Sequence, residues 1–395
     1  MLKFLYWFSL FSLALGQLGA LTKSDGANIY LFDIAITFFS LIGASEYLVR
    51  KKLLLPKYLL LLIPFIMLGV ASLIGYKHYL LTAQFITSIF YAFRLFVYAL
   101  SGVVIYNMLK DKTLHISYID NSIYAFMLLV GLGGLIQLVV LPDFRVLNTE
   151  LGWDPHQYRL ASTFFDPNFV GAFLNIGIAL ILDNIYKERK NPWLYYLFLF
   201  LSVCTFLTFS RSAWAMYGII MFLYGLLRSR RMLLASFVII FLAYFAVPRV
   251  QTRLSGITDP ADSARFRIES WSNALTLSKS YLTTGVGFNA YKYAQLDAGM
   301  LNGDTYFEHS ASGSDSSFIF VLVTTGILGF VIFLIWWFYP IMRSLLYPEY
   351  FDFLLVSVLL SLTFESQFIN SIFYPQILFM IIWIMARGSL FDNSQ

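Results

Sequence analysis

Apolar runs long enough to cross a lipid bilayer recur from one end of this chain to the other. A spanning helix needs on the order of 20 apolar residues, and the 395-residue sequence contains about twelve such runs. Hydrophobic residues make up 59% of the chain and charged residues 12%, whereas a soluble chain carries about 25% charged residues. The sequence therefore predicts an all-α polytopic membrane protein. The expected spans lie near residues 3–21, 28–48, 54–75, 79–108, 117–141, 164–185, 193–209, 212–227, 232–247, 315–338, 350–369 and 371–387.

We expect residues 1–395 to form one integral membrane domain without a soluble catalytic module. The first run has the length of a signal peptide, but a single lysine, Lys3, makes a poor n-region, so we interpret it as a retained span. The lone Cys204 lies inside a predicted span, which excludes an intramolecular disulfide. The net charge of +5 reflects loop bias and predicts no nucleic-acid partner.

Positive charge is concentrated in the short loops that follow the even-numbered spans. Because loops rich in Lys and Arg stay in the cytoplasm, both termini are expected inside. Two odd-numbered loops are long, 142–163 and 248–314, and both are expected outside. The Lys and Arg residues that mark the even loops are Arg50, Lys51, Lys52, Lys57, Lys110, Lys112, Lys187, Arg189, Lys190, Arg228, Arg230, Arg231 and Arg343.

The loop 248–314, between the ninth and tenth expected spans, has an internal pattern of its own. Spacings of four, three and four within 262–282 predict an amphipathic helix that lies on the membrane or caps a cavity. Its apolar stripe consists of Ala264, Ile268, Trp271 and Leu275. Arg265 and Arg267 flank this stripe, and Gly285-Val286-Gly287 predicts a flexible turn after it.

Several common catalytic signatures are missing from the sequence. It has no Asp-x-Asp metal pair, no P-loop and no serine nucleophile elbow. Gly285-x-Gly287 lacks the strand and helix of a dinucleotide site. The four histidines show no metal-ligand spacing. The sequence therefore predicts neither a metal nor a cofactor.

Instead, polar residues gather on the outer side of the predicted topology. Arg211 stands in a short polar break between the runs 192–209 and 213–227, where a guanidinium is costly unless it meets an anion. Guanidinium forks bind phosphate oxygens in pairs, and a carboxylate or imidazole can accept a hydroxyl proton. The outer polar residues are Arg159, Asp166, Asn168, Arg211, Arg265, Arg267, His309, Asp315 and Glu365.

Four segments, in order, resemble motifs of the O-antigen polymerase and ligase superfamily. Arg159-Leu-Ala-Ser-Thr-Phe-Phe-Asp-Pro-Asn168 is similar to its Arg-x-x-Gly-Thr-Phe-x-x-Pro-Asn signature. Leu207-Thr-Phe-Ser-Arg-Ser-Ala213 is similar to its Thr-x-Ser-Arg-Gly/Ser-Ala segment. Arg267-Ile-Glu-Ser-Trp271 with Gly285-Val-Gly287 resembles its Arg-x-x-x-Trp and Gly-x-Gly stretch. Asp315-Ser-Ser-Phe with Gly326-Ile-Leu-Gly329 falls where many members carry His-Asn-x-x-Leu and Glu-x-Gly-x-x-Gly.

The chain departs from the family pattern at three places. The family's His-Asn becomes Asp315-Ser316, its Glu becomes Thr324, and its first glycine becomes Ser162. In ligases of the family that histidine is thought to activate the acceptor. The resemblance suggests that polymerases tolerate its loss more readily, which favours a polymerase.

The resemblance implies a metal-independent membrane glycosyltransferase in the bacterial inner membrane with its active site facing the periplasm. It would polymerise polyprenyl-diphosphate-linked oligosaccharide repeats into O-antigen, capsule or exopolysaccharide. The lipid-linked donor and acceptor and the bilayer are the expected partners, with a chain-length regulator as a further one. Arg211 and Arg267 would hold the diphosphate, with Arg159 and Arg265 beside them, and Asp315 or His309 would take the hydroxyl proton. Asp166, Asn168 and Glu365 would support the site.

Two other functions fit parts of the pattern. A ligase would transfer finished polysaccharide to lipid A–core or to a protein with nearly the same site. A lipid-linked sugar transporter or flippase is more distant, because transporters place polar residues at mid-membrane in broken helices.

Most of these residues also have a purely structural interpretation. Arg211 could anchor a helix end, and Arg267 could be an ordinary surface arginine. Asp315 could cap the helix that follows it, His309 could be a loop residue, and Arg159 could form a loop salt bridge.

The same applies to the remaining candidates. Asp166-Pro-Asn168 could simply form the turn that opens the sixth span. Glu365 could be a structural partner of one arginine. Arg94, near the middle of the fourth span, is a functional candidate because intramembrane arginines are expensive.

Overall fold

The computed structural model describes residues 1–21, 28–147, 154–187, 191–255, 263–301 and 309–392. Within these ranges all regular structure is helical apart from two isolated β-bridges. The predicted all-α class is confirmed.

A helix lies at every expected span. Six helical segments in the described ranges are long and apolar enough to cross a membrane: Leu31–Val49, Lys57–Tyr79, Thr82–Lys110, Ile116–Val140, Pro167–Lys187 and Ser317–Leu346. The protein is therefore a multi-pass membrane protein, while the full number of crossings stays a prediction. The helices at the expected spans are α1 (Leu2–Leu15), α2 (Leu31–Val49), α3 (Leu62–Tyr76), α4 (Thr82–Lys110), α5 (Ile116–Val140), α7 (Pro167–Lys187), α8 (Pro192–Leu207), α9 (Arg211–Leu227), α10 (Arg230–Ala246), α15 (Ser317–Leu346), α16 (Phe353–Glu365) and α17 (Pro375–Asp392).

Several predicted boundaries differ from the structure: α1 ends at Leu15 instead of 21, α3 begins at Leu62 instead of 54, and α15 and α16 end elsewhere than expected. α15 continues to Leu346, beyond the expected end at 338. α16 ends at Glu365, before the expected end at 369, and turns lead from there to Pro375. The apolar run continues through these turns, so hydropathy alone does not reveal that the helix has stopped.

α7 lies at the centre of the bundle. Of the 18-residue apolar stretch within this helix, 83% of the residues are buried. The helix packs against α5, α8, α9, α16 and α17. At the edge, α10 packs on α9 and leaves Phe237, Phe241 and Phe245 exposed, as expected of a lipid-facing helix. Because α7 is enclosed, the residues at its beginning are held on all sides.

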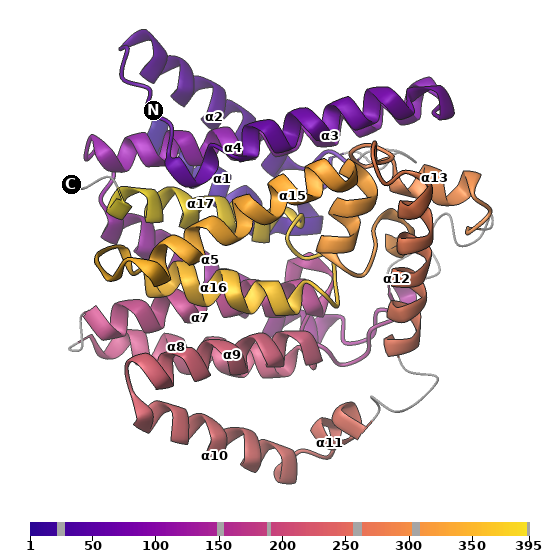
Figure 1. Cartoon of the computed structure of the whole chain (residues 1–395). Coiled ribbons are helices and arrows are strands. Elements are labelled where there is room, and N and C mark those ends of the chain that lie inside the picture. The colour runs from indigo at the N-terminus through magenta and orange to yellow at the C-terminus, as the bar shows by residue number, and fades with distance from the viewer. Residues whose placement is uncertain (22–27, 148–153, 188–190, 256–262, 302–308, 393–395) are drawn as a thin grey trace.

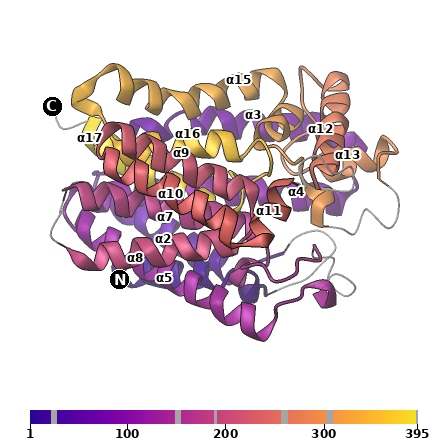
Figure 2. The same ribbon diagram turned by 90° about the horizontal axis from the view of Figure 1, so that it is seen from below.

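Three short helices cover one end of the bundle (Figure 1). They are α11 (Pro248–Ser255), α12 (Ser263–Ser280) and α13 (Tyr291–Asp297), all from the large loop. Both chain termini lie at the opposite end, as Figure 2 also shows. The arrangement agrees with the predicted topology, in which the termini and the large loop lie on opposite sides.

The helix expected in the large loop is present as α12, and of its predicted stripe Trp271 contacts the bundle through the Asp315 carbonyl and the Phe368 ring. Ala274 and Leu277 are 0% and 4% exposed, on a helix that packs against α15. Ile268 and Leu275 of the predicted stripe are 63% and 42% exposed. α12 thus caps the bundle with one face and presents apolar side chains outward with the other.

The glycine turn after α12 is anchored rather than flexible. Gly285 and Gly287 have φ values of +68° and +91°, which favour glycine. The Gly287 N–H donates to the Thr324 carbonyl at 2.8 Å, which is available because α15 breaks its helical geometry at Gly326. The loop is therefore fixed to α15 close to the beginning of that helix.

The predicted orientation can be tested by cysteine labelling. Ser280, exposed at the end of α12, is replaced by cysteine in a Cys204→Ser background. We expect it to react with a membrane-impermeant reagent in cells permeable only at the outer membrane. Lys52→Cys, in a predicted cytoplasmic loop, is the matched control and should be protected. The opposite labelling pattern would overturn the topology.

Candidate functional site

Five arginines meet at the end of the bundle covered by the large loop: Arg159, Arg211, Arg249, Arg253 and Arg267. Arg253, Arg267 and Arg249 all lower the pKa of Arg159 through their charges. Arg211 acts in the same way on Arg267, and its Nη1 donates to the Arg253 carbonyl at 3.4 Å. We call these five residues the arginine cluster.

Arg159 holds the cluster's framework together. Its Nε donates to the Thr208 carbonyl at 2.8 Å, and its Nη2 donates to Asn168 Oδ1 at 3.2 Å. The Nη1 group contacts His156 Nδ1 at 3.2 Å. Burial and the neighbouring arginines lower the pKa of Arg159 to about 9. Its hydrogen bonds thus tie the first outer loop to the break before α9 and to the beginning of α7, as a positioning residue does.

The polar break before α9 presents Arg211. Ser210 is the N-cap, since its Oγ accepts from the Ala213 N–H. The same Oγ donates to Asn168 Oδ1 at 2.7 Å, so α7 and α9 begin side by side. Arg211 is the first residue of α9, where the exposed backbone N–H groups of the helix also favour an anion.

Arg267 and Asp315 influence each other's pKa through their charges, and the backbone of Asp315 lies against α12, the helix that carries Arg267. The charge of Asp315 is the largest favourable influence on the pKa of Arg267, which burial lowers. Burial in turn raises the pKa of Asp315 to about 6, although Arg267 opposes that shift. Arg267 is therefore not an ordinary surface arginine, since it lies partly buried beside a carboxylate that titrates near neutral pH.

Asp315 is not the N-cap of α15. The helix begins at Ser317, and Ser316 caps it by accepting the Ile319 N–H at 3.3 Å. The backbone of Asp315 is fixed to α12, because its N–H donates to Ser270 Oγ at 3.0 Å and its carbonyl accepts from Trp271 Nε1 at 3.2 Å. The Asp315 carboxylate is thereby positioned without having to cap a helix.

Two more carboxylates complete the site. Asp166 Oδ1 accepts the backbone N–H groups of Asn168 and Phe169 at 2.6 and 3.3 Å, which confirms that it forms the turn opening α7. Glu365 is fully buried and accepts a hydrogen bond from Ser371 Oγ. Both carboxylates influence the pKa of Arg267, so both lie near the cluster.

A comparison with known protein families finds a match to part of the chain. Residues 196–334 match the family model described as O-Antigen ligase. The match over this segment supports the predicted resemblance to the O-antigen polymerase and ligase superfamily. The match runs from α8 into α15 and includes Arg211, Arg267 and Asp315. No curated protein matches the chain.

The Arg159–Asn168 segment lies outside the matched residues, and its geometry supports its resemblance to the O-antigen family. Ser162, at the position of the family's first glycine, has a φ of +52°. L side chains rarely adopt this conformation, whereas glycine does so without cost. The turn that a glycine would favour is therefore present here despite the substitution.

The structure does not bring every predicted site residue into the cluster. Arg265 is exposed on α12, and two residues on a helix point about 200° apart, so it lies on the side away from Arg267. His309 begins the short helix η6 (His309–Ser312), and its side chain lies outside the described residues.

The sequence interpretation overlooked Arg249 and Arg253. They lie four residues apart on α11, immediately after an expected span, and that spacing places them on one helical face. Arg249 donates to the carbonyls of Gln157 and Tyr158, which ties α11 to the first outer loop. The sequence signal that could have identified Arg249 and Arg253 is their four-residue spacing in a segment predicted to lie outside the cytoplasm.

His156 was also not among the site residues predicted from the sequence. It lies with Asp154 and Asp166, and one ligand atom from each falls within 4.8 Å of the others. Burial and the charge of Arg159 lower the pKa of His156 to about 3. The same positive potential disfavours a divalent cation at these three residues and favours an anion.

Proposed function

We propose that the protein is a membrane glycosyltransferase that uses a lipid-diphosphate-linked saccharide on the extracytoplasmic face. The observation that carries this proposal is the juxtaposition of Arg267 with Asp315 inside the arginine cluster. Clustered guanidinium groups suit a diphosphate leaving group. A carboxyl group whose pKa is about 6 suits proton acceptance near neutral pH.

The reaction follows from these roles. An acceptor hydroxyl oxygen attacks the anomeric carbon of the donor sugar and forms the new glycosidic bond. The bond from that carbon to the diphosphate oxygen breaks, and the polyprenyl diphosphate leaves with the electron pair. Arg211 and Arg267 stabilise the charge that builds on the leaving oxygen, and Asp315 takes the hydroxyl proton. In this mechanism neither a metal nor a cofactor takes part.

We favour a polymerase that joins lipid-linked repeats over a ligase. The family's ligase histidine is replaced by Asp315, whose burial gives it the pKa of a usable base. The donor and acceptor would both be polyprenyl-diphosphate-linked oligosaccharides in the bacterial inner membrane, with the site facing the periplasm. A chain-length regulator fits as a further partner. The ligase remains the second candidate, because the arginine cluster would serve it equally well.

Deletion of the gene followed by gel analysis of surface polysaccharide tests the proposal. Single repeats on the surface, with long chains restored by the wild-type gene, are the expected result. Loss of all attached polymer while long chains remain on the carrier lipid would instead identify a ligase. An unchanged polysaccharide profile would overturn both assignments.

A further inference from the structure

A cavity of about 240 Å³ opens inside the bundle, lined by none of the five residues of the arginine cluster. Its walls come from the first turns after α1, from α2 and α4, from the glycine turn, from η6 and from the beginning of α17. Small-molecule sites usually occupy ~300–1,000 Å³, so its size suits a small ligand rather than a polymer chain.

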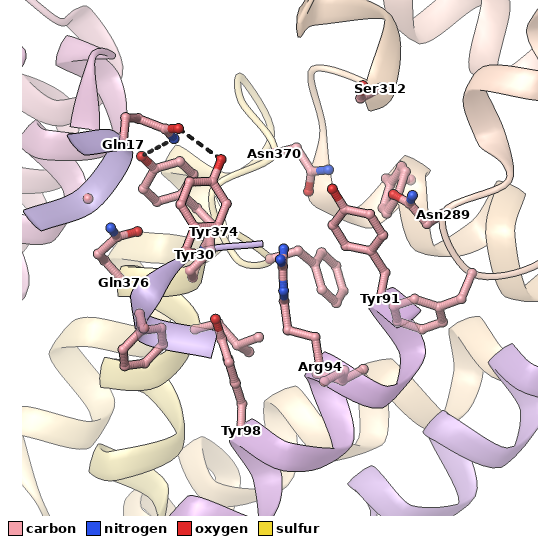
Figure 3. A pocket seen from close by; sticks show the side chains of 18 of the residues that line it. Gln17, Tyr30, Tyr91, Arg94, Tyr98, Asn289, Ser312, Asn370, Tyr374 and Gln376 are labelled. Atoms are coloured by element: carbon pink, nitrogen blue, oxygen red, sulfur yellow. Dashed lines mark hydrogen bonds between the residues drawn. The ribbon is translucent and has the colours of Figure 1, made fainter. Parts of the chain in front are cut away.

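The lining of the cavity combines aromatic rings with amide side chains (Figure 3). Tyr30 Oη donates to Gln17 Oε1 at 2.8 Å, and Gln17 Nε2 donates to Tyr374 Oη at 3.4 Å. Two amide oxygens in the lining, Asn370 Oδ1 and Gln376 Oε1, are buried without a hydrogen-bond partner among the described residues. Such atoms are costly unless a ligand or water supplies a donor.

Arg94 is the one charged residue among the described lining residues, and its charge is already balanced. Its Nη2 lies 2.6 Å from Asp33 Oδ2, with both side chains largely buried. The guanidinium also lies 4.6 Å from the centroid of the Tyr91 ring. The pair explains how an arginine is tolerated within α4, and it leaves the cavity without a net charge that would require an ionic ligand.

Three lining residues belong to, or contact, segments that carry candidate site residues. Ser312 lines the cavity, three residues before Asp315. Asn370 lines it from the turns that follow Glu365. Tyr374 stacks on Phe169, at the beginning of α7, with ring centroids 4.1 Å apart. The cavity lining and the candidate site residues Asp315 and Glu365 are therefore carried by the same loops.

From this juxtaposition we infer that the cavity is a neutral-saccharide subsite that holds the sugar carrying the acceptor hydroxyl. Aromatic faces cover the apolar faces of a sugar ring, and amide groups both donate to and accept from its hydroxyls. A diphosphate is a poor fit, because the positive charge needed for it lies in the arginine cluster instead. The inference deepens the proposed function and rests on it for the identity of the sugar.

The experiment measures binding of two probes to the protein in lipid nanodiscs free of glycoside detergent. One probe is the repeat-unit oligosaccharide released by mild acid from the carrier lipid of the deletion strain. The other is inorganic pyrophosphate. Tyr91→Leu and Asn370→Ala are each expected to weaken oligosaccharide binding at least about tenfold while pyrophosphate binding is kept. Arg211→Ala is expected to show the reverse pattern.

Matched controls keep the result interpretable. Tyr196→Leu removes a ring that is 68% exposed on α8 and should change neither affinity, and melting curves show which variants fold. Unchanged oligosaccharide affinity in both folded cavity variants would overturn the subsite. An oligosaccharide lacking its non-reducing terminal sugar should bind weakly; if loss of the reducing-end sugar matters instead, the acceptor assignment is wrong. Polymer synthesis from lipid-linked repeats is measured in a separate assay. If the wild-type protein makes no polymer in that assay, the result contradicts the proposed function, whereas the binding data still test the saccharide subsite.

Discussion

Asp315→Asn is expected to reduce polymer formation by about 10²–10⁴-fold, the usual contribution of a general base. Asparagine keeps the size of the side chain and removes the proton-accepting charge. Stability should change little, because Asp315 is fixed through its backbone and Ser316 caps α15. The measurement is polymer formed from purified lipid-linked repeat, beside a melting curve for each variant.

The pH dependence provides a second test of the same role. Burial raises the pKa of Asp315 to about 6, and only the deprotonated carboxylate can accept a proton. Wild-type activity should therefore fall as the pH drops through about 6, whereas the residual activity of Asp315→Asn should lack this step. If Asp315→Asn still lost activity as the pH dropped through about 6, the titrating group would be another residue.

Three comparison variants separate the alternatives. Ser316→Ala should destabilise the protein by about 1 kcal/mol through loss of the N-cap, with a much smaller loss of activity. His309→Ala should reduce activity less than Asp315→Asn. An active Asp315→Asn together with an inactive His309→Ala would move the base to His309. If both variants stay active, Asp166 and Glu365 become the next candidates.

The helical architecture and the centre of the site could be predicted because both depend on local signals. An apolar run of bilayer length must form a helix to satisfy its backbone groups, which explains why a helix lies at every expected span. Arg211, Arg267 and Asp315 are recognisable because each sits in a short motif or a polar break. The order of those motifs along the chain was enough to propose a shared site.

The remaining features depend on which segments meet in space, and a single sequence does not reveal that. The rotation of α12 about its axis is set by its contact with α15. As a result Arg267 is partly buried, Arg265 is exposed, and Trp271 of the predicted stripe contacts the bundle while Ile268 and Leu275 are exposed. Arg94 could not be interpreted before Asp33 was known to face it from α2. The cavity draws its lining from several separate parts of the chain between Ser12 and Leu378, none of which carries a signature alone.

Arg267→Ala is expected to reduce polymer formation by about tenfold to a hundredfold, and Arg211→Ala should do the same. A charge-assisted hydrogen bond contributes roughly 1.5–3 kcal/mol, and each 1.36 kcal/mol corresponds to about a factor of ten in rate. Arg→Lys at either position should recover little, because an ammonium cannot contact two phosphate oxygens as a guanidinium fork does. Binding of pyrophosphate by the purified variants should weaken in parallel with activity.

The matched control for Arg267→Ala is Lys279→Ala, which removes a positive charge from an exposed position on the same helix. It should keep near-normal polymer formation, and this separates the diphosphate contact from general attraction between α12 and an anionic substrate. Near-normal polymer formation by Arg211→Ala would mean that Arg211 only anchors the end of a helix. For Arg267→Ala, an unchanged pyrophosphate affinity together with lost activity would mean that the guanidinium acts through Asp315. In that case the activity of Arg267→Ala should begin to fall at a higher pH than that of the wild type, because Arg267 opposes the rise in the Asp315 pKa.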